Sequence, residues 1–93
     1  PLVLVARDEK KLQSVAQELR ERHRVEVRVI ALDLGGSRAG SQLMDQLRRD
    51  QLVPQILVNN AGFGHFGEFS SIPVERDLAI IQLNIAALTE LTK

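Results

Sequence analysis

The stretch LVLVARDEKKLQSVAQELRERHRVEVRVIALD, residues 2–33, decides the fold class of the chain. It opens with a continuous β-prone run at residues 2–6, which is typical of a strand buried on both faces of a sheet. Asp8 then suits a helix N-cap, and apolar side chains follow it at helical spacing: Leu12, Val15, Ala16 and Leu19. A second β-branched run follows at residues 25–31. Apolar and charged residues alternate at its start, which is typical of a strand nearer the sheet edge. The stretch therefore predicts a strand–helix–strand unit.

The same alternation continues toward the end of the chain. After a double-glycine break, Ser37 suits the N-cap of a second helix, which we expect to end before Pro54. Residues 56–58 read Ile-Leu-Val and predict a third short buried strand, and a glycine-rich loop follows at residues 59–67. The pattern over residues 74–93 predicts a long helical stretch of one or two helices.

Strands that alternate with helix-length connections favour a parallel sheet covered by helices on both faces. The predicted fold class is α/β, a doubly wound, Rossmann-like parallel sheet of which this chain holds a β-α-β-α-β-α portion. Its 93 residues amount to one domain at most. The chain opens directly in a strand and closes inside a helical pattern. We therefore expect residues 1–93 to be the central part of one such domain, truncated at both ends.

The composition narrows the function classes. The chain has 12 basic and 12 acidic side chains and no net charge, so nothing favours nucleic acid or an anionic membrane as a partner. Cys is absent, which excludes disulfides and thiolate metal sites, and the two His lie far apart in the sequence, so we expect no metal site. No apolar run approaches the roughly 20 residues of a membrane span. Tyr is absent as well, so this chain cannot supply a phenol to a reaction.

Polar residues follow each predicted strand at its carboxyl end. These groups are Ala6-Arg7-Asp8, Leu32-Asp33-Leu34 and Asn59-Asn60-Ala61-Gly62. Because the carboxyl ends of parallel strands share one edge of the sheet, we expect all three groups to lie there, where open α/β sheets bind ligands. The edge combines polar side chains, a fixed cation and a glycine, which suits a nucleotide cofactor.

Arg7 bears on the choice between the two nicotinamide cofactors. An acid at the end of such a strand accepts a hydrogen bond from a ribose 2′-hydroxyl, whereas an Arg binds a 2′-phosphate. The usual acid position is Ala6, so nothing there repels a phosphate. We therefore expect NADP rather than NAD. Two alternatives stay open: Arg7 only flanks the helix, or Asp8 binds the ribose instead of capping the helix.

At this point the sequence resembles the short-chain dehydrogenase/reductase family over essentially all 93 residues. The resemblance depends on three motifs in the expected elements: Asp33-Leu34, Asn59-Asn60-Ala61-Gly62, and Leu83-Asn84 with Thr89. It implies that Asp33 binds the adenine amino group, with Leu34 packing nearby. A turn aspartate is the alternative for Asp33.

The other two motifs imply further site residues. The resemblance makes Asn60, Ala61 and Gly62 cofactor contacts, because small residues let the adenosine side approach the backbone closely; a plain turn is the alternative. The resemblance also makes Asn84 a catalytic-network residue, which holds a water linked to the active Lys. The alternative is that Asn84 is simply a partly exposed residue of the helix. Thr89 is interpreted as a packing residue. His65 is interpreted as an exposed loop residue, with a substrate contact as the alternative.

Other family motifs are not in this sequence. The glycine-rich TGxxxGxG turn, the catalytic Ser and the YxxxK pair are absent. The family's first strand lies between the strands that residues 2–6 and 56–58 represent, so this segment by itself would leave a gap in its sheet.

The resemblance implies an NADP(H)-dependent oxidoreductase that acts on a carbonyl/alcohol pair by hydride transfer. In this interpretation residues 1–93 supply part of the cofactor site of an NAD(P)-binding domain and are not active alone. We expect a small-molecule carbonyl or alcohol substrate, a homo-oligomer for the full-length form and a cytoplasmic location. The alternative is a non-catalytic Rossmann-type nucleotide-binding or regulatory protein.

Overall fold

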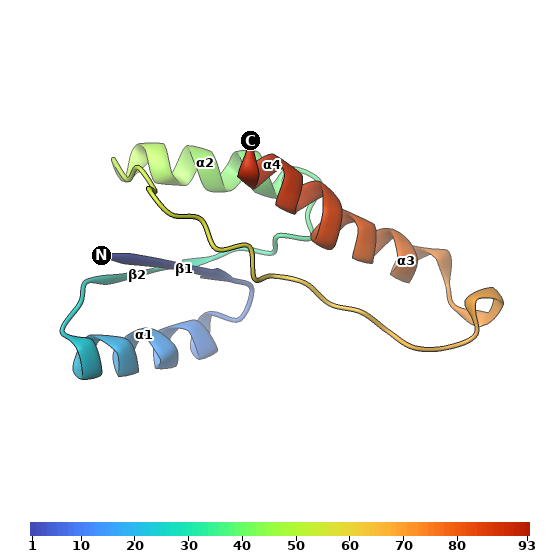
Figure 1. Cartoon of the computed structure of the whole chain (residues 1–93), viewed down its shortest axis with the longest axis horizontal. Coiled ribbons are helices and arrows are strands. Elements are labelled where there is room, and N and C mark those ends of the chain that lie inside the picture. Colours follow the sequence, from blue (N-terminus) through green and yellow to red (C-terminus); the bar gives the residue numbers. More distant parts are fainter. The chain divides into compact units, whose positions relative to one another are not determined.

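The computed structural model describes residues 1–93 (Figure 1). Two β-strands and a series of helices follow one another as β1 (Leu2–Ala6), α1 (Glu9–His23), β2 (Val27–Ala31), α2 (Ala39–Arg49), a 3₁₀ turn (Phe69–Ser71), α3 (Val74–Ile81), a π-helical segment (Gln82–Ala87) and α4 (Leu88–Thr92). The chain forms two compact units, Pro1–Asp33 and Leu34–Lys93.

The first unit is the strand–helix–strand unit that the sequence predicts. Strands β1 and β2 are parallel neighbours, paired from Leu2 with Val27 to Ala6 with Ala31. Helix α1 connects them and packs against both. It begins at Asp8, whose Oδ1 accepts a hydrogen bond from the Lys11 N–H at 3.1 Å, so the predicted N-cap is confirmed.

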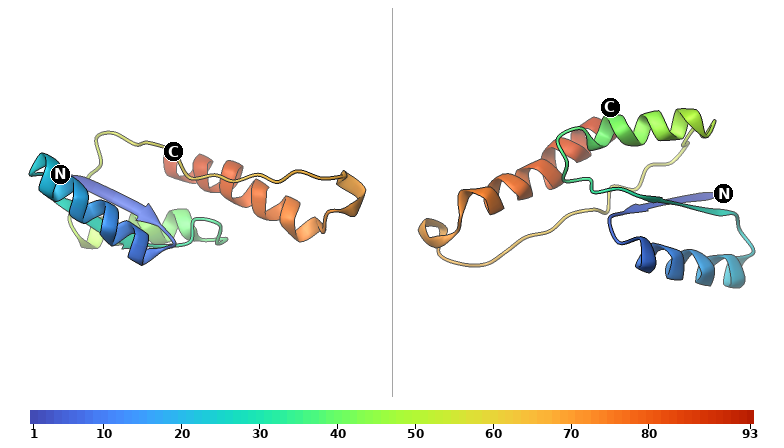
Figure 2. Two further views of the ribbon diagram at one scale, coloured as in Figure 1. Left: turned by 90° about the horizontal axis from the view of Figure 1, so that it is seen from below. Right: turned by 180° about the vertical axis from the view of Figure 1, so that it is seen from behind.

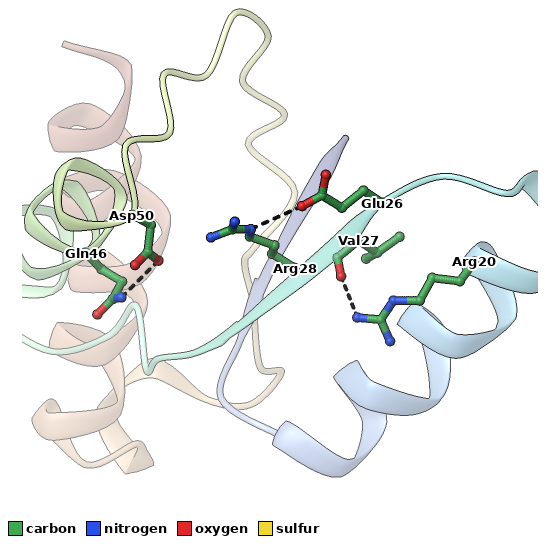
Figure 3. Close-up of polar contacts among 6 residues, drawn as sticks. All are labelled: Arg20, Glu26, Val27, Arg28, Gln46 and Asp50. Atoms are coloured by element: carbon green, nitrogen blue, oxygen red, sulfur yellow. Dashed lines mark hydrogen bonds and ion pairs between the residues drawn. The ribbon is translucent and has the colours of Figure 1, made fainter.

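A small core holds α1 to the sheet. Leu12 and Ala16 are buried on the helix, and Val27 is buried on β2. At the end of α1, the Arg20 guanidinium donates to the main-chain oxygen of Val27 (Figure 3). Arg24 ends the helix in the left-handed region, with φ of 50°. The last helical turn is therefore tied to the strand that follows it. The residues inside β1 are only partly buried, so the expectation of a strand buried on both faces is not met within this unit.

The second unit opens with α2, which starts one residue later than the sequence predicts. Arg38, not Ser37, holds the N-cap position, and its side chain makes no capping hydrogen bond. The predicted Ser37 cap is therefore wrong. The end of α2 is well defined: Gln51 has φ of 57°, and the N–H of Leu52 donates to the Leu47 oxygen at 2.8 Å. This is a Schellman ending, and it stops the helix before Pro54 as expected.

Residues 56–58 do not form the predicted third strand. The sheet contains only β1 and β2, and residues 52–68 are an extended connection. Val53, Ile56 and Val58 are 88%, 84% and 77% exposed. A strand needs a neighbour for its N–H and C=O groups. The family resemblance places that neighbour in a strand whose sequence is not in this chain, which accounts for the difference.

The predicted helical stretch near the end of the chain is confirmed as one continuous helix. Figure 2 shows α3, the π-helical segment and α4 joined end to end. Its apolar side chains Leu78, Ile81, Ile85 and Leu88 are exposed. Thr89 does not pack as expected, because it is exposed and its hydroxyl donates to the Ile85 oxygen. None of the helices is both long and apolar enough to span a membrane.

Gly40 lets α2 and α4 approach closely. A Cβ built at Gly40 would lie 2.7 Å from Glu90 Cβ, a distance that real Cβ atoms do not adopt. Elements α2 and α4 are in contact. A residue larger than glycine at position 40 must therefore push the two helices apart.

The substitution Gly40→Ala tests this contact. Helix propensity alone favours Ala by about 1 kcal/mol, whereas overpacking typically costs about 1–3 kcal/mol. Since Glu90 Cβ cannot rotate away, we expect the overpacking cost to win and the free energy of unfolding of the full-length protein to fall, as measured in urea. Gly64→Ala is the control, because its Cβ would meet nothing within 4 Å. Equal or higher stability for Gly40→Ala would contradict the close packing.

The exposed apolar residues predict the behaviour of residues 1–93 expressed alone. Large side chains such as Ile56, Val58, Phe69 and Ile85 are more than half exposed, and the outer edge of β1 has no partner strand. Such surfaces promote association. We expect aggregation or a loosely packed state by size-exclusion chromatography, and no NADPH turnover. A monomer with a cooperative thermal transition would show that the segment folds independently.

Candidate functional site

The carboxyl edge of the two-stranded sheet brings two of the predicted groups together. Ala6 pairs with Ala31 at the end of the ladder, and the N–H of Leu32 donates to the Ala6 oxygen at 2.9 Å. Arg7 follows β1 and Asp33 follows β2, so both leave the sheet at the same edge, as the sequence predicts. Both residues are exposed.

At this edge Arg7 and Asp8 differ in how they are engaged. No side-chain hydrogen bond or ion pair involves Arg7, so its guanidinium is available to a ligand. Asp8 already accepts the hydrogen bond from the Lys11 N–H, and its second oxygen lies 4.0 Å from Lys11 Nζ. Asp8 is thus engaged within α1, whereas the Arg7 side chain is not engaged. Leu34 is only 8% exposed, so little of it is accessible to a ligand.

The third predicted group, Asn59-Asn60-Ala61-Gly62, does not follow a strand, because that strand is not formed. Asn60, Ala61 and Gly62 are exposed and lie in the extended connection. The N–H of Asn60 donates to the Val58 oxygen at 3.1 Å, which is a local contact. Within the second unit, the helix at residues 74–92 therefore determines where this segment lies.

Three polar contacts hold residues 59–65 along that helix. Asn59 Nδ2 donates to Thr92 Oγ1 at 3.0 Å, Phe63 binds Asn84, and His65 Nε2 lies 3.3 Å from Asp77 Oδ1. As the loop advances, its partners step back along the helix, so the two run antiparallel. They lie side by side in both views of Figure 2.

The spacing of these contacts fits an extended chain on a helix. From Thr92 to Asn84 a helix rises about 12 Å, at 1.5 Å per residue. From Asn59 to Phe63 an extended chain spans about 13 Å, at roughly 3.3 Å per residue. The two distances match, so the Asn59 and Phe63 contacts can form together without distorting either element.

Asn84 makes the tightest of these attachments. Its Nδ2 donates to the Phe63 oxygen at 2.8 Å, and its Oδ1 accepts from the Phe63 N–H at 3.1 Å. The carboxamide thus satisfies both main-chain groups of one loop residue. A Cβ at Gly62 would lie 3.2 Å from Asn84 Oδ1, so glycine leaves the room that this attachment needs. Asn84 lies in the π-helical segment, a feature that is frequent at functional sites.

His65 does not fit its interpretation as an exposed loop residue. Its side chain is only 12% exposed, and it contacts Asp77, which is 27% exposed. Neither this contact nor the binding of Phe63 by Asn84 is evident from the sequence. The only signal was that Asp77 and Asn84 are spaced about two helical turns apart, and so share a helix face.

Metal chemistry finds no support in the geometry. The structure contains no group of three or more His, Cys, Asp or Glu side chains that could hold a metal ion.

Comparison with known proteins identifies the family. The sequence profile of the short chain dehydrogenase family matches residues 1–93. The chain belongs to the short-chain dehydrogenase family. Its fold is accordingly a partial Rossmann-like α/β fold, which confirms the predicted class.

Among curated relatives, the chain is similar to inactive hydroxysteroid dehydrogenase-like protein 1 of Rattus norvegicus and of Homo sapiens. Each is 32% identical over 88 residues, which cover 92% of this chain. The match spans 26% of each relative, so this short-chain dehydrogenase chain covers about a quarter of their length.

Solved structures of family members superpose closely on the chain. The short-chain dehydrogenase from Sphingobium yanoikuyae in complex with NADPH is 37% identical with a TM-score of 0.84, over 97% of this chain and 35% of that one. L-Sorbose reductase from Gluconobacter frateurii, complexed with NADPH and L-sorbose, is 29% identical with a TM-score of 0.86, over 97% of this chain and 34% of that one.

Proposed function

We propose that the full protein is an NADP(H)-dependent oxidoreductase that interconverts a carbonyl and an alcohol by hydride transfer. In this proposal residues 1–93 form the central part of its one NAD(P)-binding domain. The observation that carries the proposal is the free Arg7 guanidinium directly after β1, with Ala6 where an acid would repel a phosphate. Two family members with NADPH bound support the choice of cofactor.

The residues present suit the adenosine half of this cofactor. An exposed Arg offers a planar fork of donors to a 2′-phosphate. Asp33 accepts a hydrogen bond from the adenine amino group, and Leu34 packs nearby. Asn60, Ala61 and Gly62 contact the adenosine side, where the small residues and an exposed backbone permit close approach.

The chemistry divides between the cofactor and the chain. Bound NADPH supplies the hydride that reduces the carbonyl carbon, and the new alkoxide oxygen takes up a proton. Asn84 is the catalytic-network residue of this chain and holds a water on the proton path. Since the chain contains no Tyr, the phenol that the family uses as general acid must come from outside residues 1–93.

The proposal also covers the substrate class, the oligomeric state and the location of the protein. We expect a small-molecule carbonyl or alcohol substrate, because one similar structure is a bulky-bulky ketone specific alcohol dehydrogenase and another is a reductase complexed with L-sorbose. A homo-oligomeric full-length form and a cytoplasmic location are also part of the proposal.

A second function has one observation in its favour. The curated relatives in rat and human carry the word inactive in their names. The alternative is therefore a non-catalytic Rossmann-type protein that binds the nucleotide without turnover. NADPH oxidation by the full-length protein with a panel of ketones and ketoses distinguishes the two: binding without turnover favours the alternative.

Replacing the residues after β1 tests the cofactor choice. We expect the wild type to prefer NADPH over NADH by about ten- to hundred-fold, because hydrogen bonds to a charged group contribute roughly 1.5–3 kcal/mol. Ala6→Asp combined with Arg7→Ser should invert this preference, since the new carboxylate repels the phosphate and accepts from a free 2′-hydroxyl. The measurement is kcat/KM for both cofactors in the full-length enzyme, and the NADPH preference should weaken as salt rises.

The matched control is Arg22→Ser, which removes an exposed Arg of α1 that pairs with Glu18. We expect this variant to keep the wild-type cofactor ratio. A wild type that prefers NADH, or a double variant with an unmoved ratio, would return Arg7 to a helix-flanking role and make Asp8 the ribose candidate.

Substitution of Asn84 tests its place in the proton path. In the full-length enzyme, Asn84→Ala should lower kcat by about ten-fold or more, above 1.4 kcal/mol, and change the NADPH Kd far less. Gln82→Ala is the control, because it removes an amide from the same π-helical segment whose weak bond, at 3.4 Å, goes to the Gly36 oxygen. Wild-type turnover in Asn84→Ala would leave Asn84 with a structural role alone.

A further inference from the structure

His65 is the one shielded residue of a long exposed connection. From Val53 to Ser71 every other residue is exposed, including Phe63 and Phe66, which are 44% and 106% exposed. The His65 side chain is 12% exposed. Burial of a polar ring is unfavourable unless its polar groups are used. The loop therefore buries His65 while Phe63 and Phe66 stay exposed.

That contact joins the loop to the first turns of α3. His65 Nε2 lies 3.3 Å from Asp77 Oδ1. A carboxylate can only accept a hydrogen bond, so the contact is favourable with a proton on Nε2. The other ring nitrogen, Nδ1, is buried and has no partner. Asp77 is thus the polar group that holds the ring in place.

The same loop is bound by Asn84 two residues earlier. Phe63 exchanges two hydrogen bonds with the Asn84 carboxamide, and Gly64 separates it from His65. A Cβ at Gly64 would meet nothing within 4 Å, so this residue adds no contact of its own. His65 is thus the next residue of the loop after Phe63 whose side chain contacts the helix.

We propose that His65, held by Asp77, is a positioning residue for Asn84, because it keeps the Phe63 main chain in the orientation that the Asn84 carboxamide binds. The proposal deepens the proposed function and rests on it for its kinetic consequence. Neither His65 nor Asp77 touches reacting atoms in this proposal. Their effect reaches the reaction through Asn84.

A double-mutant cycle in the full-length enzyme tests this route. His65→Ala and Asp77→Ala should each lower kcat by about three- to ten-fold, the range that the loss of one net hydrogen bond allows, with the NADPH Kd nearly unchanged. Added to Asn84→Ala, either change should cost nothing further, because the group that it positions is already absent. Fully additive losses, or wild-type kcat in His65→Ala, would overturn the proposal.

Conservative variants separate positioning from general destabilisation. Gln carries a donor near the position of His65 Nε2, and Asn carries one near Nδ1. We expect His65→Gln to restore most of the kcat and His65→Asn not to. Glu75→Gln is the control for Asp77→Ala, because Glu75 is an exposed acid of the same helical turn. Equal kinetics for the Gln and Asn variants would contradict a specific contact through Nε2.

A readout without activity keeps the two proposals distinguishable. The N–H of Phe63 donates to Asn84 Oδ1, so its hydrogen exchange reports the loop directly. Exchange at Phe63 should accelerate in His65→Ala and in Asn84→Ala, and not in Glu75→Gln. If the wild type lacks turnover, the proposed function fails while this measurement still tests His65. Unchanged Phe63 exchange in His65→Ala would overturn the positioning role by itself.

Discussion

The second unit depends on the binding of an irregular loop by the polar side chains of one helix. Residues 59–65 have no strand partner, so their position is determined by Thr92, Asn84 and Asp77. Each contact is worth only about 1 kcal/mol. Together they align the loop with the helix over several turns, because four extended residues from Asn59 to Phe63 span about the same length as eight helical residues from Thr92 to Asn84. The segment that we assign to the cofactor is thus placed by side-chain hydrogen bonds.

The first unit is organised by a different interaction. There the backbone ladder between β1 and β2 sets the position of Arg7 and Asp33, and α1 covers the sheet with Leu12 and Ala16. Because the two strands are parallel and their ladder ends at Ala6 and Ala31, Arg7 and Asp33 must both leave the sheet at its carboxyl edge. Arg7 is consequently presented to solvent with no competing partner inside the chain, which is what recognition of a charged ligand requires.

Much apolar surface of the chain is exposed because no other element packs against it. Ile56 and Val58 belong to a sequence that prefers a strand, and Leu78 and Ile85 belong to an amphipathic helix, yet all four are exposed. Local strand and helix propensity determines which segments are amphipathic or apolar. Burial of their apolar side chains also requires another element to pack against them.

The sequence alone determined the βαβ unit, the Asp8 cap, the end of α2 and the helical nature of residues 74–92, because spacing and caps act over a few residues. It also placed Arg7 and Asp33 at one sheet edge. It failed for residues 56–58, since pairing needs a partner distant in sequence. It also missed the contacts of Phe63 with Asn84 and of His65 with Asp77. Only the tertiary structure decided these, because an extended loop carries no periodicity that reveals which helix face will bind it.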